Sequence, residues 1–389
     1  MSMVMDAAME AWDRGLSTIP DKQLCGKHIA DYAIRRFIKR TGQKGQCDYC
    51  GNTRVVIQLD TLLYFITDAL LHFYTDPANF MSYDSSEGGY LGEVEGPWEM
   101  LENLGLNIPD KILWDDLYNS FDHATPWADQ QSALSDFKYE GWLHFKHIVK
   151  HQSRFLFIGK EEFRVGHQTI TARDFLKQII GDIRRQRMLT QIPTGTALYR
   201  CRQHLKMSEV AEASDICAPK AEHAVNPNRM SPAGIAMFYG ALNAETAKLE
   251  TFDRSDRTKP FLSQAIFTPK EDLLLIDLSK IPVISPFDQE NWELYDRVEF
   301  LRRFLREFSA PISRDSYAHI EYVPTQIITE FLRYNFKRRD GKKIDGIIYP
   351  SSKNRSLNAL VLFMDHYECL KRLDFDTSNL VQEKVIYLK

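Results

Sequence analysis

The stretch NPNRMSPAGIAMFYGALNAETAKLE, residues 226–250, holds the most informative pattern of this 389-residue chain. The Ser, Pro and Gly that follow Arg229 predict a loop, the letters MFYG predict a short strand, and ETAKLE predicts the start of a helix. Arg229, Tyr239 and Glu250 can therefore converge on one cleft from three consecutive segments. Each also has an ordinary alternative, as a surface cation, a core aromatic and an exposed helical residue.

On both sides of this stretch, segments typical of strands alternate with segments typical of helices. A helical stripe covers residues 294–308, and a second helix is expected after Pro324, a residue that suits the first helical turn. The apolar, β-rich segments are 197–201, 263–269, 272–278, 346–350 and 357–363. This alternation predicts a mixed α/β or α+β domain over residues 191–389.

The first half of the chain has a different texture. Apolar residues recur at helical spacing in TLLYFITDALLHFY, residues 61–74, and again in 137–148 and in 171–189. We therefore expect a helical domain over residues 59–190, preceded by a separate segment, 1–58. The whole chain is expected to be of the α+β class.

The segment 1–58 contains three of the six cysteines. Cys25-x2-His28 is separated by 18 residues from Cys47-x2-Cys50, which is a spacing found in structural zinc sites. The alternative is an ordinary Cys and His beside an unrelated Cys-x2-Cys. We favour a zinc knuckle with a structural role, because four protein ligands leave no open position for a substrate.

The composition bounds the classes of function. With 49 Lys and Arg against 53 Asp and Glu the net charge is −4, so the overall charge of the surface does not favour non-specific binding of nucleic acid. The basic run KRRDGKK, residues 337–343, is expected to be a solvated helix end followed by a turn. The acidic residues near the start argue against an export signal. We expect a cytoplasmic protein without a membrane partner or a nucleic-acid partner, and its oligomeric state stays open.

Several motifs of the second half resemble the RES domain family. They occur in the family's order and extend over nearly the whole C-terminal half. The motifs are LYRCR at 198–202, RMSPAG, FYGA and TAKLE within 229–250, LLLIDLSKIP at 273–282, EYVPTQIITEFLR at 321–333, DGIIYPSS at 345–352 and NALVLF at 358–363. The first half resembles the zinc-containing, HEPN-related helical domain that precedes some RES domains, with His28 standing where such sequences often have a second Cys.

The resemblance implies a fold similar to ADP-ribosyltransferase toxins and a role as the toxin of a toxin–antitoxin pair. Such toxins consume NAD+ by hydrolysis or phosphorolysis, or transfer ADP-ribose to a protein. An antitoxin or another inhibitory protein is therefore an expected partner. The family's catalytic residues fall on Arg229, Tyr239, Glu250 and Ser351, and substrate-binding positions fall on Arg200, Ser352 and Gln326. Either Ser351 or Ser352 can be the family serine, and the role of Gln326 is left unassigned.

These residue types suit cleavage of the nicotinamide–ribose bond. Positive charge develops on the sugar, so Glu250 is expected near the ribose, Tyr239 beside the leaving ring, and Arg200 with Arg229 at the pyrophosphate. The chain has no Gly-rich dinucleotide fingerprint after a strand, so NAD+ is expected as substrate and Zn2+ as the structural cofactor. Two alternatives stay open, namely an ADP-ribosyltransferase acting on a macromolecule, and a zinc-dependent binding protein with a silent RES domain.

One further motif is set aside. Arg314 and His319 have the spacing of the HEPN ribonuclease motif, but they lie in the RES half, and we attribute the match to chance.

Overall fold

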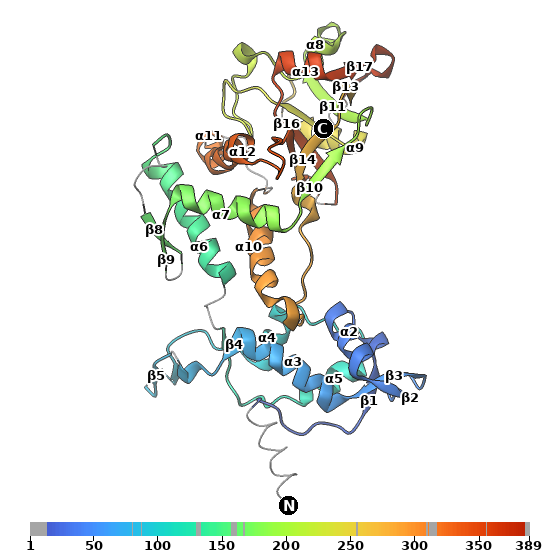
Figure 1. Ribbon diagram of the computed structural model, residues 1–389, viewed down its shortest axis with the longest axis vertical. Helices are drawn as coiled ribbons and strands as arrows, with labels where there is room; N and C mark the ends of the chain where they lie inside the picture. The colour runs from blue at the N-terminus through green and yellow to red at the C-terminus, as the bar shows by residue number, and fades with distance from the viewer. Residues whose placement is uncertain are drawn as a thin grey trace, which may run out of the picture. The chain divides into compact units, whose positions relative to one another are not determined.

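The structure, a computed structural model, separates into two compact units (Figure 1). The first comprises Met1–Asp136 with Val283–Arg297, and the second comprises Phe137–Pro282 with Val298–Lys389. These two units are divided after residues 136, 282 and 297, whereas the sequence predicts domain boundaries after residues 58 and 190. The residues described are 14–79, 81–86, 88–129, 134–156, 162–165, 168–253, 256–308, 310, 317–354 and 356–385.

The first unit is built on helix α3, Leu59–Phe73, whose apolar residues are buried as the helical pattern predicts. A small antiparallel sheet in the order β1-β3-β2 precedes it. Phe287 of the returning segment is buried in the same core. The other elements are β1 Gln23–Cys25, the 3-10 turn η1 Gly26–His28, α2 Tyr32–Thr41, β2 Gln43–Gln46, β3 Thr53–Gln58, β4 Tyr74–Thr75, η2 Pro77–Asn79, β5 Tyr83–Asp84, β6 Gly89–Tyr90, α4 Pro97–Asn103, α5 Lys111–Asn119, β7 Ala128–Asp129 and η7 Gln289–Asn291.

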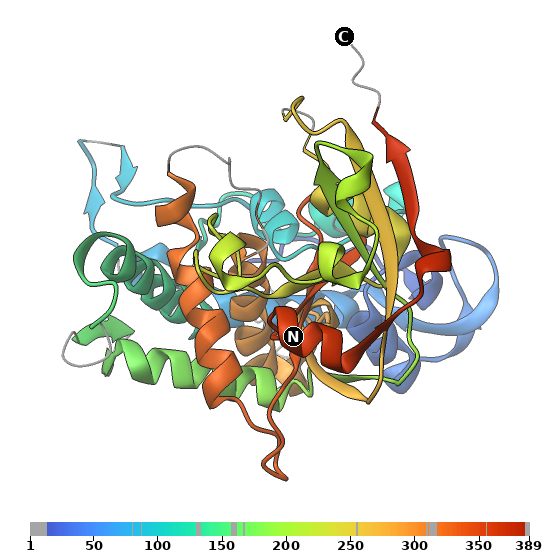
Figure 2. The ribbon, with the colours of Figure 1, turned by 90° about the horizontal axis from the view of Figure 1, so that it is seen from above.

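The second unit contains the large sheet. Its strands run in the order β10-β14-β15-β16-β12-β11-β13-β17, with β18 also paired to β13. Among the described strands of this sheet only β14 and β15 pair in parallel, and Figure 2 shows β11, β13 and β18 side by side. The strands are β10 Leu189–Ile192, β11 Leu198–His204, β12 Phe238–Ala241, β13 Phe261–Pro269, β14 Leu273–Asp277, β15 Gly346–Pro350, β16 Asn358–Leu362, β17 Leu373–Phe375 and β18 Val381–Lys384. The expected strands and the α+β class are confirmed.

Apolar side chains cover both faces of the sheet's centre. Ile347 packs into one core together with Phe175 and Phe304, whereas its neighbour Ile348 packs into the core on the opposite face with Phe238. The helices are α6 Leu134–His147, α7 Ala172–Arg185, α8 Ala213–Ile216, α9 Ala244–Thr251, α10 Trp292–Phe308 (whose residues up to Arg297 belong to the first unit), α11 Ala318–Glu321, α12 Val323–Asn335 and α13 His366–Arg372. Shorter elements are the π-helical turn Ile148–Gln152, the hairpin of β8 Glu162–Val165 and β9 Gln168–Thr171, and the 3-10 turns Met207–Glu209, Ala221–His223, Leu278–Lys280 and Thr377–Asn379.

The basic run 337–343 forms the expected turn. Helix α12 ends at Asn335, and Gly341 adopts a φ of 84°, a left-handed conformation that glycine tolerates without strain. No helix among the described residues is both long and apolar enough to cross a bilayer.

A buried ion pair fixes helix α6 to helix α7. The Lys138 ammonium lies 2.6 Å from the carboxylate of Asp182, whose side chain is 1% exposed. Replacing Lys138 by Met should lower the free energy of unfolding by about 3 kcal/mol, because the buried Asp182 carboxylate keeps only its contact with the exposed Arg185, at 3.1 Å. The measurement is urea denaturation followed by tryptophan fluorescence.

The matched control for that variant is Lys177→Met, which removes the exposed partner of Asp174 on the same helix α7. An exposed pair contributes less than about 1 kcal/mol. Equal midpoints for the two variants would show that the Lys138 pair does not hold the helices together.

Candidate functional site

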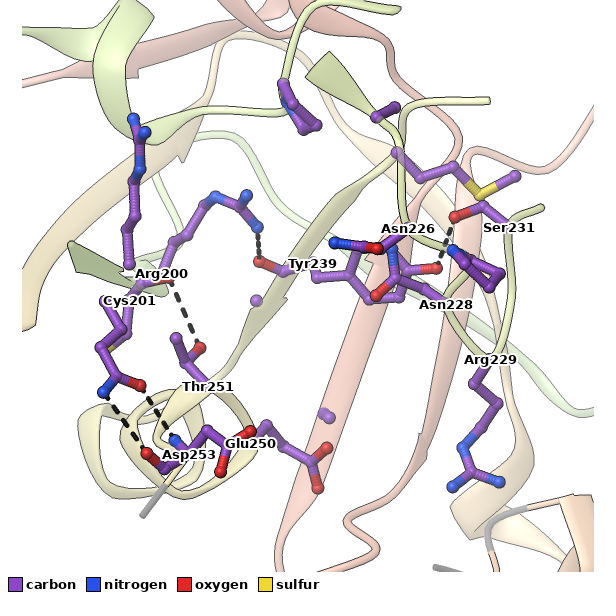
Figure 3. A pocket seen from close by; sticks show the side chains of 18 of the residues that line it. Arg200, Cys201, Asn226, Asn228, Arg229, Ser231, Tyr239, Glu250, Thr251 and Asp253 are labelled. Carbon is purple, nitrogen blue, oxygen red and sulfur yellow. Dashed lines mark hydrogen bonds between the residues drawn. The ribbon is translucent and has the colours of Figure 1, made fainter. Parts of the chain in front are cut away.

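The second unit contains a cavity of about 870 Å³. This volume lies at the upper end of the range of about 300–1,000 Å³ that is typical of small-molecule sites. Five of the seven catalytic and substrate-binding residues expected from the sequence line it, namely Arg200, Arg229, Tyr239, Glu250 and Ser352. Figure 3 shows four of them: Arg200 on β11, Tyr239 on β12, Arg229 on the loop before β12, and Glu250 on α9.

Glu250 reaches the cavity from helix α9. Asn243 caps the start of the helix, and its side chain accepts a hydrogen bond from the Thr246 backbone N–H at 2.8 Å. Ala247 is buried and lines the cavity, and Glu250 lies three residues further along, so both are on the same helix face. The stretch forms the strand and the helix expected from its sequence, and Glu250 lines the same cavity as Arg229 and Tyr239.

Both candidate serines contact this carboxylate, in different ways. Ser351 is fully buried behind it and donates its hydroxyl proton to Glu250 Oε1, while the Ser352 backbone N–H donates to the same oxygen at 2.9 Å. The Ser351 hydroxyl oxygen also accepts hydrogen bonds from the backbone N–H groups of Lys353 and Asn354 at 3.2 and 3.3 Å. The turn after β15 thus holds the Ser351 hydroxyl and the Ser352 amide against Glu250.

Two tyrosines line the same cavity as Glu250. The Tyr239 hydroxyl lies 2.9 Å from Ser231 Oγ, as Figure 3 shows. Burial raises the pKa of Tyr239, and burial together with the nearby Glu250 charge raises the pKa of Tyr349 well above its usual value. Both side chains are therefore neutral phenols near pH 7, able to donate a hydrogen bond or to stack.

The two arginines are held by backbone oxygens. Arg200 donates to the carbonyl oxygens of Ile216 and Tyr239, and Arg229 donates to those of Phe308 and Ala310, at 2.8 and 2.6 Å. Burial lowers the pKa of Arg200, yet a guanidinium starts so high that it stays charged. Within the described part of the chain neither arginine forms an ion pair, so two positive charges without a carboxylate partner face one cavity.

Gln326 does not line the cavity, but it fixes the loop that carries Arg229. Its side-chain amide is buried and donates to the carbonyl oxygens of Asn228 and Ser231, at 2.8 and 3.2 Å. The neighbouring Thr325 hydroxyl donates to the Arg229 carbonyl oxygen at 2.6 Å. The first turn of α12 therefore holds the loop through the carbonyl groups on both sides of Met230.

The sequence reasoning missed several residues that line the cavity. Tyr349 precedes the serine turn by two positions, and strand alternation could have placed it on the same face as Ser351. His319 also lines the cavity, whereas Arg314 lies outside the described residues. The other lining residues not expected from the sequence include Asn226, Asn228, Ser231, Tyr322, Lys353, Asp253 and Asp256.

The four expected metal ligands come together in the first unit. One ligand atom from each of Cys25, His28, Cys47 and Cys50 can be chosen so that all lie within 4.8 Å of one another. The Cys25 and Cys50 sulfur atoms are 3.9 Å apart, and Cys47 Sγ is 3.5 Å from His28 Nε2. A tetrahedral zinc site has edges of about 3.8 Å between sulfurs and about 3.5 Å between sulfur and nitrogen. These two separations match those edges, so the Cys3His group can hold a metal ion.

Comparison with protein families matches both halves of the chain. The HEPN/RES N-terminal domain 1 matches residues 40–163, and the RES domain matches residues 197–377. No curated protein matches the chain. The cavity residues named above lie within the RES match, whereas Cys25 and His28 precede the N-terminal match. The chain is therefore a RES-domain protein with an HEPN/RES-type N-terminal domain.

Proposed function

We propose that the protein consumes NAD+ by cleaving the bond between nicotinamide and ribose. The observation that carries this proposal is the Glu250 carboxylate, which is held by two serines in a cavity that also contains two arginines without carboxylate partners among the described residues. This combination suits NAD+, because the arginines match its anionic pyrophosphate and the carboxylate matches the positive charge that develops on the ribose as the bond breaks.

The residues take distinct roles in this reaction. Glu250 stabilises the positive charge on the ribose, and Ser351 with the Ser352 amide keeps the carboxylate in position. Tyr239 offers a neutral aromatic wall for the nicotinamide ring. Arg229 and Arg200 contribute positive charge toward the pyrophosphate, while their carbonyl contacts keep both guanidinium groups in place.

The electron balance of the step needs no general acid at the leaving group. The pair of electrons in the C1′–N bond moves to the pyridinium nitrogen, so nicotinamide leaves as a neutral ring. Water or phosphate then forms a bond to C1′. Hydrolysis yields ADP-ribose and releases one proton, and phosphorolysis yields a phosphorylated ADP-ribose.

Product analysis of purified full-length protein incubated with NAD+ tests the proposal. Nicotinamide release with free ADP-ribose supports hydrolysis, and a phosphorylated product that appears only with phosphate supports phosphorolysis. Label on protein after incubation of a lysate with labelled NAD+ supports the transferase alternative. NAD+ that remains intact in all three incubations rejects the proposal and favours a silent RES domain.

Gln326 provides a test of the loop that carries Arg229. Replacing it by Met removes the hydrogen bonds to the carbonyl groups of Asn228 and Ser231, so we expect kcat to fall by about tenfold or more as Arg229 and Ser231 shift. KM for NAD+ should rise as well, because Arg229 is proposed to contribute to binding of the pyrophosphate, whereas Glu250 and Arg200 are held by other segments.

The control for that variant is Gln191→Met. Gln191 is exposed, donates its amide to Asp272 and lies outside the cavity lining. A Gln326→Glu variant should regain activity as the pH falls, because a protonated carboxyl can donate to one of the two carbonyls. An unchanged kcat in Gln326→Met would show that Gln326 does not position the loop that carries Arg229.

For the metal centre we propose Zn2+ with a structural role. Three thiolates and one imidazole form the donor set that zinc prefers in tetrahedral sites, and the separations of the ligand atoms fit such a site. Four protein ligands leave no position for a reacting water.

A further inference from the structure

We propose that helix α5 is part of the metal centre, with Asp110 as the residue that orients His28. This inference rests on the proposed zinc and is independent of the NAD+ chemistry. Neither the Cys and His motif nor its spacing points to residues 110–119, which lie 60 residues beyond Cys50 at their start.

Asp110 contacts the ring nitrogen of His28 that faces away from the cysteines. Its Oδ2 lies 2.7 Å from His28 Nδ1, while His28 Nε2 is the atom near Cys47 Sγ. A carboxylate at this place accepts a hydrogen bond from Nδ1–H and so keeps the ring proton on Nδ1, which leaves Nε2 with a lone pair for a metal. Both side chains are shielded from water, with 8% of His28 and 24% of Asp110 exposed.

The other oxygen of Asp110 starts helix α5. Asp110 Oδ1 accepts hydrogen bonds from the backbone N–H groups of Ile112 and Leu113, at 3.1 and 3.2 Å. One carboxylate therefore caps a helix and holds a metal ligand at the same time. Ordering His28 around a metal orders the first turn of α5, and the reverse holds by linkage.

A second carboxylate of α5 faces the other pair of ligands. Asp116 Oδ2 accepts a hydrogen bond of 2.9 Å from the hydroxyl of Tyr49, which lies between Cys47 and Cys50 in the sequence. Lys22, just before β1, donates to the same oxygen. Helix α5 thus contacts both halves of the knuckle, through Asp110 at the Cys25–His28 pair and through Asp116 at the Cys47–Cys50 pair.

The test compares zinc affinity in two full-length variants, Asp110→Asn and Asp31→Asn, by competition with a chromophoric chelator. Asp31 caps helix α2 in the same way, accepting from the N–H groups of Ala33 and Ile34 at 2.8 and 3.0 Å, but contacts no metal ligand among the described residues. We expect Asp110→Asn to weaken zinc binding by about 10- to 100-fold, and Asp31→Asn to change it by less than about threefold.

The physical reason lies in the amide that replaces the carboxylate. If the amide oxygen keeps the cap, the NH2 group faces His28 Nδ1, and the ring proton is driven to Nε2, the ligand atom. If the amide flips, the cap is lost. Should Asp110→Asn fold poorly, Asp110→Ser keeps a capping hydroxyl, cannot reach His28 and should show the same loss of affinity.

Hydrogen exchange gives a second readout. Zinc should slow amide exchange in residues 111–119 of the wild type, and it should do so less in Asp110→Asn. If wild type binds no zinc, the proposed metal is wrong. If the wild type binds zinc but Asp110→Asn and Asp31→Asn bind it equally well, the inference about α5 is wrong, whereas the proposed zinc site is still supported.

Discussion

Glu250→Gln should lower the rate of nicotinamide release from NAD+ by about 100- to 1,000-fold, the loss typical of removing one preorganised electrostatic contact. The substitution keeps the shape of the side chain and an oxygen that can accept from Ser351 and Ser352, but removes the negative charge. The fold should therefore persist while the developing charge on the ribose loses its partner. Single-turnover measurement of nicotinamide by liquid chromatography is the direct readout.

The same helix offers a matched control. Glu245 lies in the first turn of α9, is exposed and does not line the cavity, so Glu245→Gln should leave the rate unchanged. In cells, Glu250→Gln should also lose any toxicity of the wild type. A Glu250→Gln enzyme with the wild-type rate would exclude the proposed role of the carboxylate.

Cys47→Ser should abolish tight zinc binding and unfold the first unit. Cys47 is fully buried, and its sulfur lies near His28 and accepts from the Cys25 backbone N–H at 3.3 Å. Structural zinc contributes on the order of 10 kcal/mol to folding in small zinc domains, more than most domains have in reserve. Metal analysis should find about one zinc per wild-type chain and far less in the variant, with faster proteolysis within residues 14–129.

Cys369→Ser controls for the loss of a buried thiol. Cys369 lies in the second unit, where its thiol points to the Met364 carbonyl oxygen, and it is not among the four grouped ligands. This variant should keep its zinc and its resistance to proteolysis in the first unit. Freshly purified wild type without zinc would contradict the prediction for Cys47.

Patterns that are local in sequence predicted local structure well. The strand MFYG became β12, ETAKLE became α9, and the four ligands in residues 25–50 came together as their spacing indicated. Each of these depends on hydrophobic periodicity or on turn residues within a few positions. The family resemblance then supplied the residues around the cavity.

Contacts between distant residues could not be predicted in this way. The Ser351 hydroxyl and the Glu250 carboxylate are 101 positions apart, and Gln326 is 98 positions from Asn228. Their pairing follows from how the sheet and α12 bring separate loops together. The residues near Arg200 and Arg229 in the sequence do not indicate which carbonyl groups hold the two guanidinium groups, and the contact of both arginines with a pyrophosphate stays a prediction.

Residues 283–297 belong to the first unit although the chain on both sides of them belongs to the second, which affects what happens when the gene is divided. Phe287 is 1% exposed in a core whose other buried members all come from the first part of the chain, although the segment is encoded inside the RES match. A deletion of residues 1–136 would remove the side chains that bury Phe287. A copy of the RES region alone would likewise carry the segment 283–297 without the core into which it packs. Recombination that separates residues 1–136 from residues 283–297 would therefore expose apolar surface in both pieces.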